Sequence, residues 1–299
     1  MNRLAVIVLT YNSKKVTLDC LESIFSKKWQ TPFSIWLVDN NSQDQTIEAV
    51  RDKFPEVKII ASKKNLGFAG GNNLALKKTF KNYPFLLLLN NDTLVKEKSL
   101  DKLVEFFEDS PYSIATCKLE YPGGAFQANV GRLPVFPYIF IWLSGVDDLF
   151  RKLFGLPSYQ ERNERFYQGD KDVGWVSGAV MLIKAEVLKK IGFLDDKIFM
   201  YGEDVDFCWR AKKADFKVGF TDRTSIVHIG GASFEQPKYN QWLGEFRGLI
   251  YLYEKNYGEL SSIILKIFIY FFVFLRIIAF ALIGKKDYAK TYFKVFKNL

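Results

Sequence analysis

The sequence predicts an α/β protein: a mostly parallel sheet flanked by helices, followed by a C-terminal tail of apolar and basic amphipathic helices. Two observations support this fold class. Over the first 120 residues, short apolar runs alternate with stretches whose apolar residues recur at helical spacing. The C-terminus instead combines one long apolar run with a group of lysines. Because the early apolar runs are continuous rather than alternating, we expect a sheet covered on both faces.

Five apolar runs are short enough to be strands. The first is too short for a secretion signal, since polar residues follow it at once. A helix is expected next, because Val16, Cys20 and Ile24 recur at helical spacing, with Asn12 or Ser13 placed to cap it. The expected strands are Leu4–Leu9, Ile35–Val38, Val57–Ala61, Phe85–Leu89 and Ile114–Leu119.

Composition narrows the class of protein. The chain has 299 residues, 48% of them hydrophobic, which suffices for a sizeable core. Its 42 Lys and Arg against 33 Asp and Glu give a net charge of +9, which suits anionic partners such as nucleotide diphosphates or acidic lipid. Lysines gather beside the C-terminal apolar run, so we expect lipid and no nucleic acid as a partner. Cys20, Cys117 and Cys208 predict neither a disulfide framework nor a zinc cluster.

Polar residues follow four of the expected strands. Ligands of such sheets bind beyond the carboxyl ends of the strands, so these residues are expected to form one site able to hold a nucleotide. No glycine follows the first strand, which argues against a dinucleotide fold, and a Walker phosphate loop is absent. The four segments are Thr10–Asn12, Asp39–Ser42, the glycine-rich Asn65–Asn73 and Asn90–Thr93.

A second group of chemically active residues lies later in the chain. Residues 123–172 are irregular, and we assign no chemistry there. Order returns at Trp175–Ala179, before an apolar strand-like run and a helix-like stretch. Glu203, Asp204 and Asp206 then stand beside large aromatics, where a carboxylate suits a general base or begins a helix. His228 is the single histidine of the chain.

Taken together, these segments resemble family 2 glycosyltransferases, which have a Rossmann-like GT-A fold, and within them the rhamnosyltransferase-like branch of polysaccharide biosynthesis in the cell envelope. The resemblance covers residues 4 to 235. It implies inverting transfer of a sugar, such as rhamnose, from a nucleotide-sugar donor to a glycan or lipid-linked acceptor. A sheet-containing domain over residues 1–255 and a membrane-associating segment over 256–299 are expected.

The same resemblance implies a role for each matching residue. Asp204 would be the catalytic base, and Asp92 and His228 would hold a divalent cation, Mn²⁺ or Mg²⁺. Trp175, Ser177, Gly178 and Glu203 would lie on the acceptor side. The donor would contact Thr10, Tyr11, Asn12, Asp39, Asn65, Gly67, Gly70, Gly71, Asn91 and Asp92.

Two departures from the family pattern matter. Asn90 stands where the metal motif has its first aspartate, so a single carboxylate remains there. The Gln-x-x-Arg-Trp motif of processive synthases is missing, which implies that the enzyme adds one sugar or a few. Two other classes stay open: a nucleotidyltransferase of related architecture, and a basic membrane-associated scaffold without catalysis.

The tail predicts attachment to the cytoplasmic side of a membrane. Residues 261–283 are apolar apart from Lys266 and Arg276, which fall with Tyr270 on one side of a helix. In a second helix, four lysines recur at helical spacing, with Tyr292, Phe293 and Phe296 expected to face away from them. Such helices lie in the membrane interface. A spanning helix, a helix packed on the protein and a contact within a homo-oligomer remain alternatives.

Overall fold

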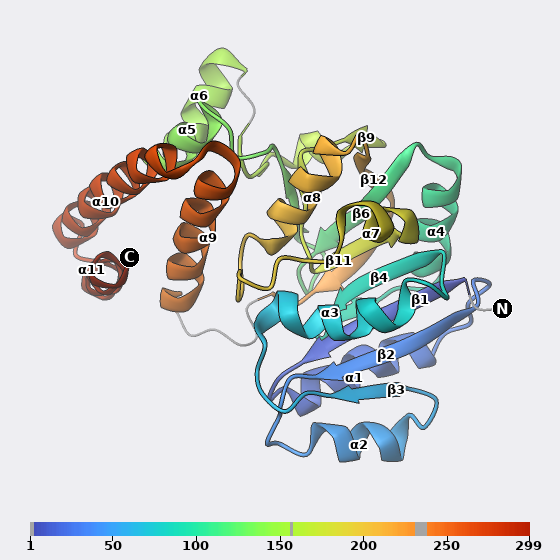
Figure 1. Ribbon diagram of the computed structural model, residues 1–299. Helices are drawn as coiled ribbons and strands as arrows, with labels where there is room; N and C mark the ends of the chain where they lie inside the picture. The colour runs from blue at the N-terminus through green and yellow to red at the C-terminus, as the bar shows by residue number, and fades with distance from the viewer. Residues whose placement is uncertain (1–2, 156–157, 231–237) are drawn as a thin grey trace. The chain divides into compact units, whose positions relative to one another are not determined.

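A computed structural model of the chain describes residues 3–155, 158–230 and 238–299. It divides into two compact units, each built from separate stretches of chain. The first, here called the sheet unit, consists of Met1–Leu133, Gln160–Phe199 and Asp204–Ala232. The second, the helical unit, consists of Pro134–Tyr159, Met200–Glu203 and Ser233–Leu299. Figure 1 labels their elements.

One mixed sheet runs through the sheet unit, with the central order β3-β2-β1-β4-β11-β6-β12-β5. The strands β7 and β9 pair with β6 and β12, and a separate small ladder joins β8 to β10. The bounds are β1 Leu4–Thr10, β2 Phe33–Asp39, β3 Lys58–Ala61, β4 Phe85–Asn90, β5 Thr93–Val95, β6 Tyr112–Glu120, β7 Phe126–Gln127, β8 Val130–Gly131, β9 Lys171–Asp172, β10 Trp175–Val176, β11 Val180–Lys184 and β12 Lys217–His228.

The expected strands are confirmed, and their pairing places the expected site at one edge. Strand β1 is parallel to β2 and β4, so Thr10 lies beside Asp39 and Leu9 beside Asn90. Other pairs are antiparallel: β5 and β9 pair with β12 in this way, and β7 with β6. Strand β11 runs antiparallel to both β4 and β6. It starts beside Leu89, so the chain enters this strand from the edge that carries the site.

Helices α1 to α4, α7 and α8 complete the sheet unit, and the apolar residues of its core are fully buried. The capping expected before α1 is only half correct. Ser13 is the N-cap residue, but its hydroxyl donates to Tyr11, and the Asp44 carboxylate accepts from the first helical N–H of Lys14. The bounds are α1 Lys14–Phe25, α2 Thr46–Lys53, α3 Gly67–Thr79, α4 Ser99–Asp109, the short 3-10 helix Glu164–Tyr167, α7 Ala185–Ile191 and α8 Glu203–Lys213.

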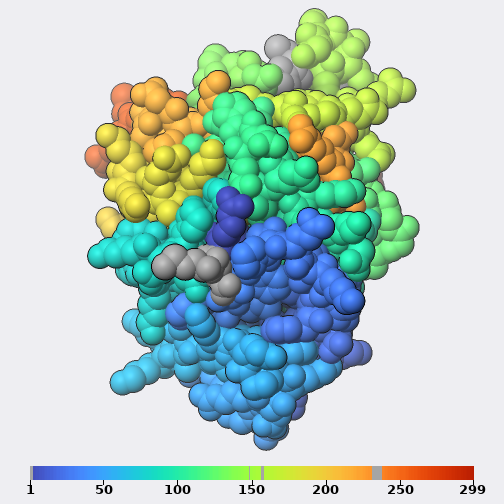
Figure 2. Space-filling model, turned by 90° about the vertical axis from the view of Figure 1, so that its right-hand side faces the viewer, coloured from blue at the N-terminus to red at the C-terminus, as the bar shows by residue number. Residues whose placement is uncertain are grey.

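The opposite edge of the sheet, where β1 begins, is closed by polar contacts between distant segments. Asp101 of α4 accepts hydrogen bonds from the backbone of Gln30 and Thr31, and Arg3 forms an ion pair with Glu108 at 2.5 Å. Figure 2 looks onto this side, where the blue N-terminal segments lie beside green ones. This edge is therefore closed by structural contacts, whereas the predicted site residues gather at the other.

The helical unit packs α5 (Tyr138–Ser144), α9 (Tyr239–Tyr257), α10 (Glu259–Leu282) and α11 (Lys286–Asn298) around one apolar core, with α6 (Asp147–Phe154) beside α5. The boundary expected after residue 255 lies inside α9, whose Phe246 and Leu249 share that core with Leu265 and Ile269 of α10. The membrane role expected of the tail stays a prediction.

Helix α10 is long and apolar enough to cross a bilayer, and 17% of its most apolar stretch is buried. Its charged side faces the protein: Arg276 donates to the carbonyl of Leu143, 2.7 Å away, and lies over the ring of Tyr292. The opposite side, here called the α10 face, is apolar and exposed. It consists of Leu260, Ile263, Ile264, Ile267, Phe268, Phe271, Phe274, Leu275, Ile278 and Leu282.

The expectation for α11 is correct for Tyr292, which is buried in the core, and wrong for Phe293. Phe293 is exposed, and the ammonium of Lys297 lies 4.7 Å from the centre of its ring. The reason is helical geometry, because residues four apart share a face.

Candidate active site

The carboxyl end of β2 carries the buried carboxylate of Asp39. Its Oδ2 accepts from the backbone N–H of Ser42 at 3.0 Å, whereas its Oδ1 is buried and has no hydrogen-bond partner among the described residues. A buried carboxylate oxygen that lacks a donor is costly unless a ligand supplies one. Asp39 therefore offers an acceptor at the position where a nucleobase N–H is expected.

The next residue, Asn40, connects this strand end to the segment before α3. Its amide donates to Asn65 Oδ1 and to the carbonyl of Gly67, and its Oδ1 accepts from Leu66. The predicted donor residue Asn65 thus has a defined place beside β2. Asn40 was not among the predicted site residues, although its position directly after Asp39 was visible in the sequence.

The glycine-rich segment is part of a helix and not a loop. Gly67 to Gly71 form the first turns of α3 and are packed against protein. A Cβ on Gly67, at φ +71°, would lie 2.1 Å from the carbonyl oxygen of Phe199, and one on Gly71 would lie 2.5 Å from Leu9. Gly70 faces Leu66 in the same way, at 2.9 Å. These glycines permit close packing of α3, so their predicted contact with the donor rests on backbone atoms.

The segments after β1 and β4 are joined by a buried polar network. The hydroxyl of Thr10 lies 2.8 Å from that of Thr17, and the amide of Asn91 donates to both. Asn12 donates its N–H to Ser42, and its side chain accepts from Gln43. Thr10, Asn12 and Asn91 thereby position the strand ends, whereas the ring of Tyr11 is exposed and available to stack on a base.

The side chains of Asp92 and His228 lie together, just after β4 and at the end of β12. Oδ1 of Asp92 is 3.1 Å from Nε2 of His228, and Nδ1 of His228 is 2.8 Å from Oε1 of Gln127. An amide oxygen only accepts, so Nδ1 donates to Gln127 and Nε2 is the nitrogen that faces Asp92. When the ring carries its single proton on Nδ1, Nε2 keeps a lone pair and can bind a cation together with Oδ1 of Asp92.

This pair fits a divalent cation that takes its remaining ligands from a substrate. Among the described residues, no group of three or more His, Cys, Asp and Glu side chains is arranged to hold a metal. Asn90, which replaces the first aspartate of the family motif, instead places its amide 3.3 Å from Nε2 of His228. One carboxylate and one imidazole suit Mn²⁺ or Mg²⁺ bound together with diphosphate oxygens.

Asp204 lies at the start of α8, where its carboxylate accepts from the backbone N–H groups of Gly178, at 3.1 Å, and Val205, at 2.8 Å. Burial raises the pKa of the Asp204 carboxyl above its ordinary value, and these two hydrogen bonds oppose the change only in part. A carboxylate with increased proton affinity suits a general base.

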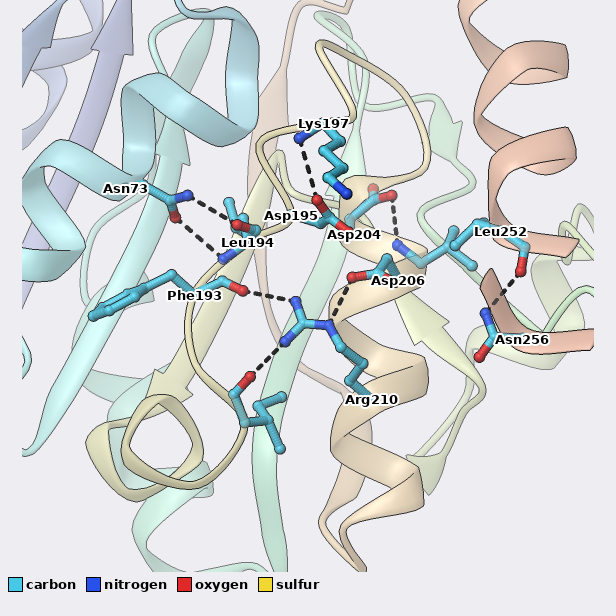
Figure 3. A network of polar contacts seen from close by, with 12 residues as sticks. Asn73, Phe193, Leu194, Asp195, Lys197, Asp204, Asp206, Arg210, Leu252 and Asn256 are labelled. Atoms are coloured by element: carbon cyan, nitrogen blue, oxygen red, sulfur yellow. Dashed lines mark hydrogen bonds and ion pairs between the residues drawn. The ribbon is translucent and has the colours of Figure 1, made fainter. Parts of the chain in front are cut away.

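Asp206, the second aspartate of α8, helps to hold the loop that precedes this helix. Asp206, which is buried, accepts from Arg210 at 2.7 Å, and the same guanidinium donates to the carbonyls of Ile191 and Phe193. Asn73 of α3 bonds both backbone groups of Leu194. Figure 3 shows these contacts around Asp204. Neither Arg210 nor Asn73 was assigned this role from the sequence, because the carbonyls that Arg210 binds and the backbone groups that Asn73 binds leave no pattern there.

The residues predicted on the acceptor side have different environments. Trp175 and Glu203 are buried, and Ser177 accepts from the N–H of Ala179. Gly178 contacts both α8 and α3. Its N–H donates to the carboxylate of Asp204, and a Cβ on Gly178 would lie 2.8 Å from the ring of Phe68 in α3. Asp204 and the glycine-rich helix therefore meet at Gly178.

Comparison with known proteins finds a matching family model and similar sequences. Residues 5–192 match the family model described as glycosyl transferase family 2. The chain is 23% identical over 230 residues to a low-salt glycan biosynthesis hexosyltransferase of Haloferax volcanii, covering 76% of this chain and 67% of that protein. It is 24% identical over 237 residues to the N-acetylglucosaminyl-diphospho-decaprenol L-rhamnosyltransferase of Mycobacterium tuberculosis, covering 75% of each.

A solved structure shares the fold. The mannosyltransferase of Pyrobaculum calidifontis in complex with GDP-Man and Mn²⁺ superposes with a TM-score of 0.56 at 16% identity, over 98% of this chain and 73% of that one. The expected GT-A class, with its helix-flanked sheet and apolar C-terminal helix, is thereby confirmed.

Proposed function

Because the chain belongs to glycosyl transferase family 2 and is a glycosyltransferase, we propose that it moves one sugar from a nucleoside-diphosphate donor to a glycan or lipid-linked acceptor, inverting the anomeric carbon. The observation that carries this proposal is the paired Asp92 and His228 in the same unit as Asp204, a half-buried carboxylate whose pKa is raised. Incubation with a panel of nucleotide sugars, with release of nucleoside diphosphate as readout, tests it. A chain that binds but converts no donor would contradict it.

Asp204 acts as the base of the reaction. Its carboxylate takes the proton of the acceptor hydroxyl while that oxygen attacks the anomeric carbon from the face opposite the leaving diphosphate. The anomeric C–O bond to the diphosphate breaks in the same displacement, which inverts the carbon. Such proton transfer is worth about 10² to 10⁴ in rate.

Asp92 and His228 would hold a divalent cation, and the contact of Gln127 with Nδ1 would keep the imidazole in the tautomer that can bind it. The cation, when bound, stabilises the negative charge that develops on the diphosphate. Because the protein offers one carboxylate and one imidazole here, donor and metal bind together. The enzyme adds one sugar or a few, since the processive synthase motif is absent from the sequence.

The class of substrate is proposed from the relatives. The relatives include a hexosyltransferase and a rhamnosyltransferase, and the name of the second gives a diphospho-decaprenol as its substrate. Rhamnose is therefore the first donor sugar to test, and a polyprenyl diphosphate the first acceptor. The product would enter a glycan of the cell envelope.

We expect Asp39→Ala to weaken binding of a pyrimidine nucleoside diphosphate by about 10- to 100-fold, because hydrogen bonds to a charged group are worth about 1.5–3 kcal/mol. Isothermal titration calorimetry of the folded variant measures this loss. Asp52→Ala, at an exposed position of α2, is the matched control and should bind as the parent does. Equal affinity of both variants would show that Asp39 does not bind the base.

We also propose that the α10 face attaches the protein to the cytoplasmic side of a membrane. At about 100° per residue, its side chains cover a stripe roughly 140° wide along the helix. The charged side of the helix is already packed within the helical unit, as the Arg276 contact illustrates, which favours a helix lying flat in the interface. A lipid-linked acceptor would lie in the same surface.

We expect the full chain to sediment with vesicles that contain anionic lipid and to be partly released by salt, because lysines are attracted by about 1 kcal/mol each near such a surface. Phe271→Glu should reduce the bound fraction, whereas Asn82→Glu, at an exposed turn of the sheet unit, should not. A parent protein that stays in the supernatant and dimerises through the α10 face would reject the membrane proposal.

A further inference from the structure

Helix α6 exposes much of its apolar surface. Its apolar side chains Leu149, Leu153 and Phe154 are 51%, 65% and 66% exposed, whereas the carboxylate of Asp147 is 6% exposed and accepts from the hydroxyl of Ser158 at 2.8 Å. An amphipathic helix on the surface of a soluble protein does the opposite and turns its apolar side inward. The exposed side of α6 is therefore suited to an apolar environment.

This surface continues the α10 face. Phe136, just before α5, is 76% exposed, and its ring lies 5.5 Å from that of Phe140. The ring of Phe140 lies 4.7 Å from that of Phe268, which belongs to the α10 face. Since Arg276 of α10 also donates to the last turn of α5, the two parts are fastened together within the helical unit.

We propose that α6 and Phe136 form a second membrane contact, which inserts into the interface of an anionic bilayer beside the α10 face. This inference rests on the membrane attachment proposed above. The charge of the C-terminal stretch favours lipid over a protein partner: Leu260–Leu299 contains seven Lys and Arg and the single acidic residue Asp287. In α6, Lys152 is exposed beside Leu153. Apolar side chains flanked by basic ones are typical of interfacial helices.

A second contact has a mechanical consequence. When a single helix lies flat in a membrane, its apolar stripe is the only feature that resists rotation of the helix about its own axis. A contact displaced from that axis opposes this rotation. The α5–α6 segment therefore fixes the orientation in which the helical unit meets the bilayer.

The chain allows this proposal to be tested by labelling at single positions. Burial raises the pKa of each of the thiols Cys20, Cys117 and Cys208 to about 12, and all three are fully buried. At neutral pH they carry almost no thiolate, which is the reactive form. An introduced surface cysteine is then the position that reacts with a dye.

The experiment uses the full chain with an environment-sensitive dye on Leu153→Cys, on Phe271→Cys of the α10 face, or on Lys102→Cys, an exposed control in α4. Each is mixed with vesicles of phosphatidylcholine, with or without phosphatidylglycerol. We expect the emission at positions 153 and 271 to move to shorter wavelength with the anionic vesicles, and the emission at 102 to stay unchanged. Leu153→Glu should weaken vesicle binding about tenfold or more, and Asn82→Glu should not.

The other outcomes separate the two proposals. A response at 271 without one at 153 overturns the α6 contact and leaves the membrane attachment standing. No response at either position overturns both. A response at 153 that needs no vesicles and grows with protein concentration means that a second copy covers α6, and it overturns the lipid assignment.

Discussion

Asp204→Asn is expected to reduce sugar transfer by about 10² to 10⁴ while nucleotide affinity stays within error, because the amide keeps the shape of the side chain but accepts no proton. Single-turnover assays measure the chemical step, and calorimetry with a nucleoside diphosphate measures binding. Glu203→Gln changes the neighbouring carboxylate and should cost much less. If Glu203→Gln were the inactive variant, the base would be one position earlier.

The pH dependence gives an independent check. Burial raises the pKa of Asp204, and the base works only when deprotonated, so the acidic limb of the rate profile should lie above the ordinary aspartate range. In the variant that limb should disappear from the residual activity. A limb at the ordinary value in the parent enzyme would argue against Asp204 as the base.

The same shift predicts an effect on stability. The pKa of Asp204 is higher in the folded state than in the unfolded one, so folding favours the protonated form. The stabilisation is complete below the unfolded pKa and is lost as pH rises through the folded pKa. Asp204→Asn should therefore raise Tm at pH 7 by a few degrees, on the order of 2–4 °C, and the gain should shrink in acid.

The second large effect is expected from metal removal. Excess chelator should reduce transfer by about 10³, since stabilisation of the leaving diphosphate by a cation is worth several kcal/mol. Asp92→Asn should lose most of this activity, and His228→Ala should weaken Mn²⁺ binding about 10- to 100-fold. Electron paramagnetic resonance of Mn²⁺ with a nucleoside diphosphate measures that affinity directly.

Controls separate metal binding from folding. Glu97→Gln removes an exposed carboxylate shortly after β5 and should leave both activity and Mn²⁺ affinity unchanged. Gln127→Leu keeps the metal ligands but removes the acceptor that orients His228, so it should weaken Mn²⁺ binding less than His228→Ala does. Full turnover in chelator would refute a role of the metal in catalysis.

The sequence predicted β1 to β4 and β6 well, because each contains a short and largely apolar run. It also supplied the residue types at the strand ends, and the structure brings Asp92 and His228 together across 136 positions of chain. Gln127 escaped prediction because it lies in a two-residue strand within an aperiodic stretch. Arg210 is visible as an i+4 partner of Asp206, but its carbonyl acceptors are not.

The glycine-rich segment shows where composition misleads. Glycine has low intrinsic helix propensity, so five residues from Gly67 to Gly71 that include three glycines predict a loop. They nevertheless form the start of α3, because β1 and the backbone of Phe199 approach too closely for a side chain. Tertiary packing overrides local propensity here, and only the three-dimensional neighbours reveal it.

The order in which the helical unit is assembled affects its synthesis. Ile139 and Leu143 of α5 share a core with Leu265 and Ile269 of α10, although 128 residues of chain separate the end of α6 at Phe154 from the end of α10 at Leu282. At about 5–20 residues per second, a ribosome needs roughly 6 to 25 s to make that interval. During this time α5 lacks its partner, so the nascent chain exposes an adhesive apolar segment that must be shielded until translation is complete.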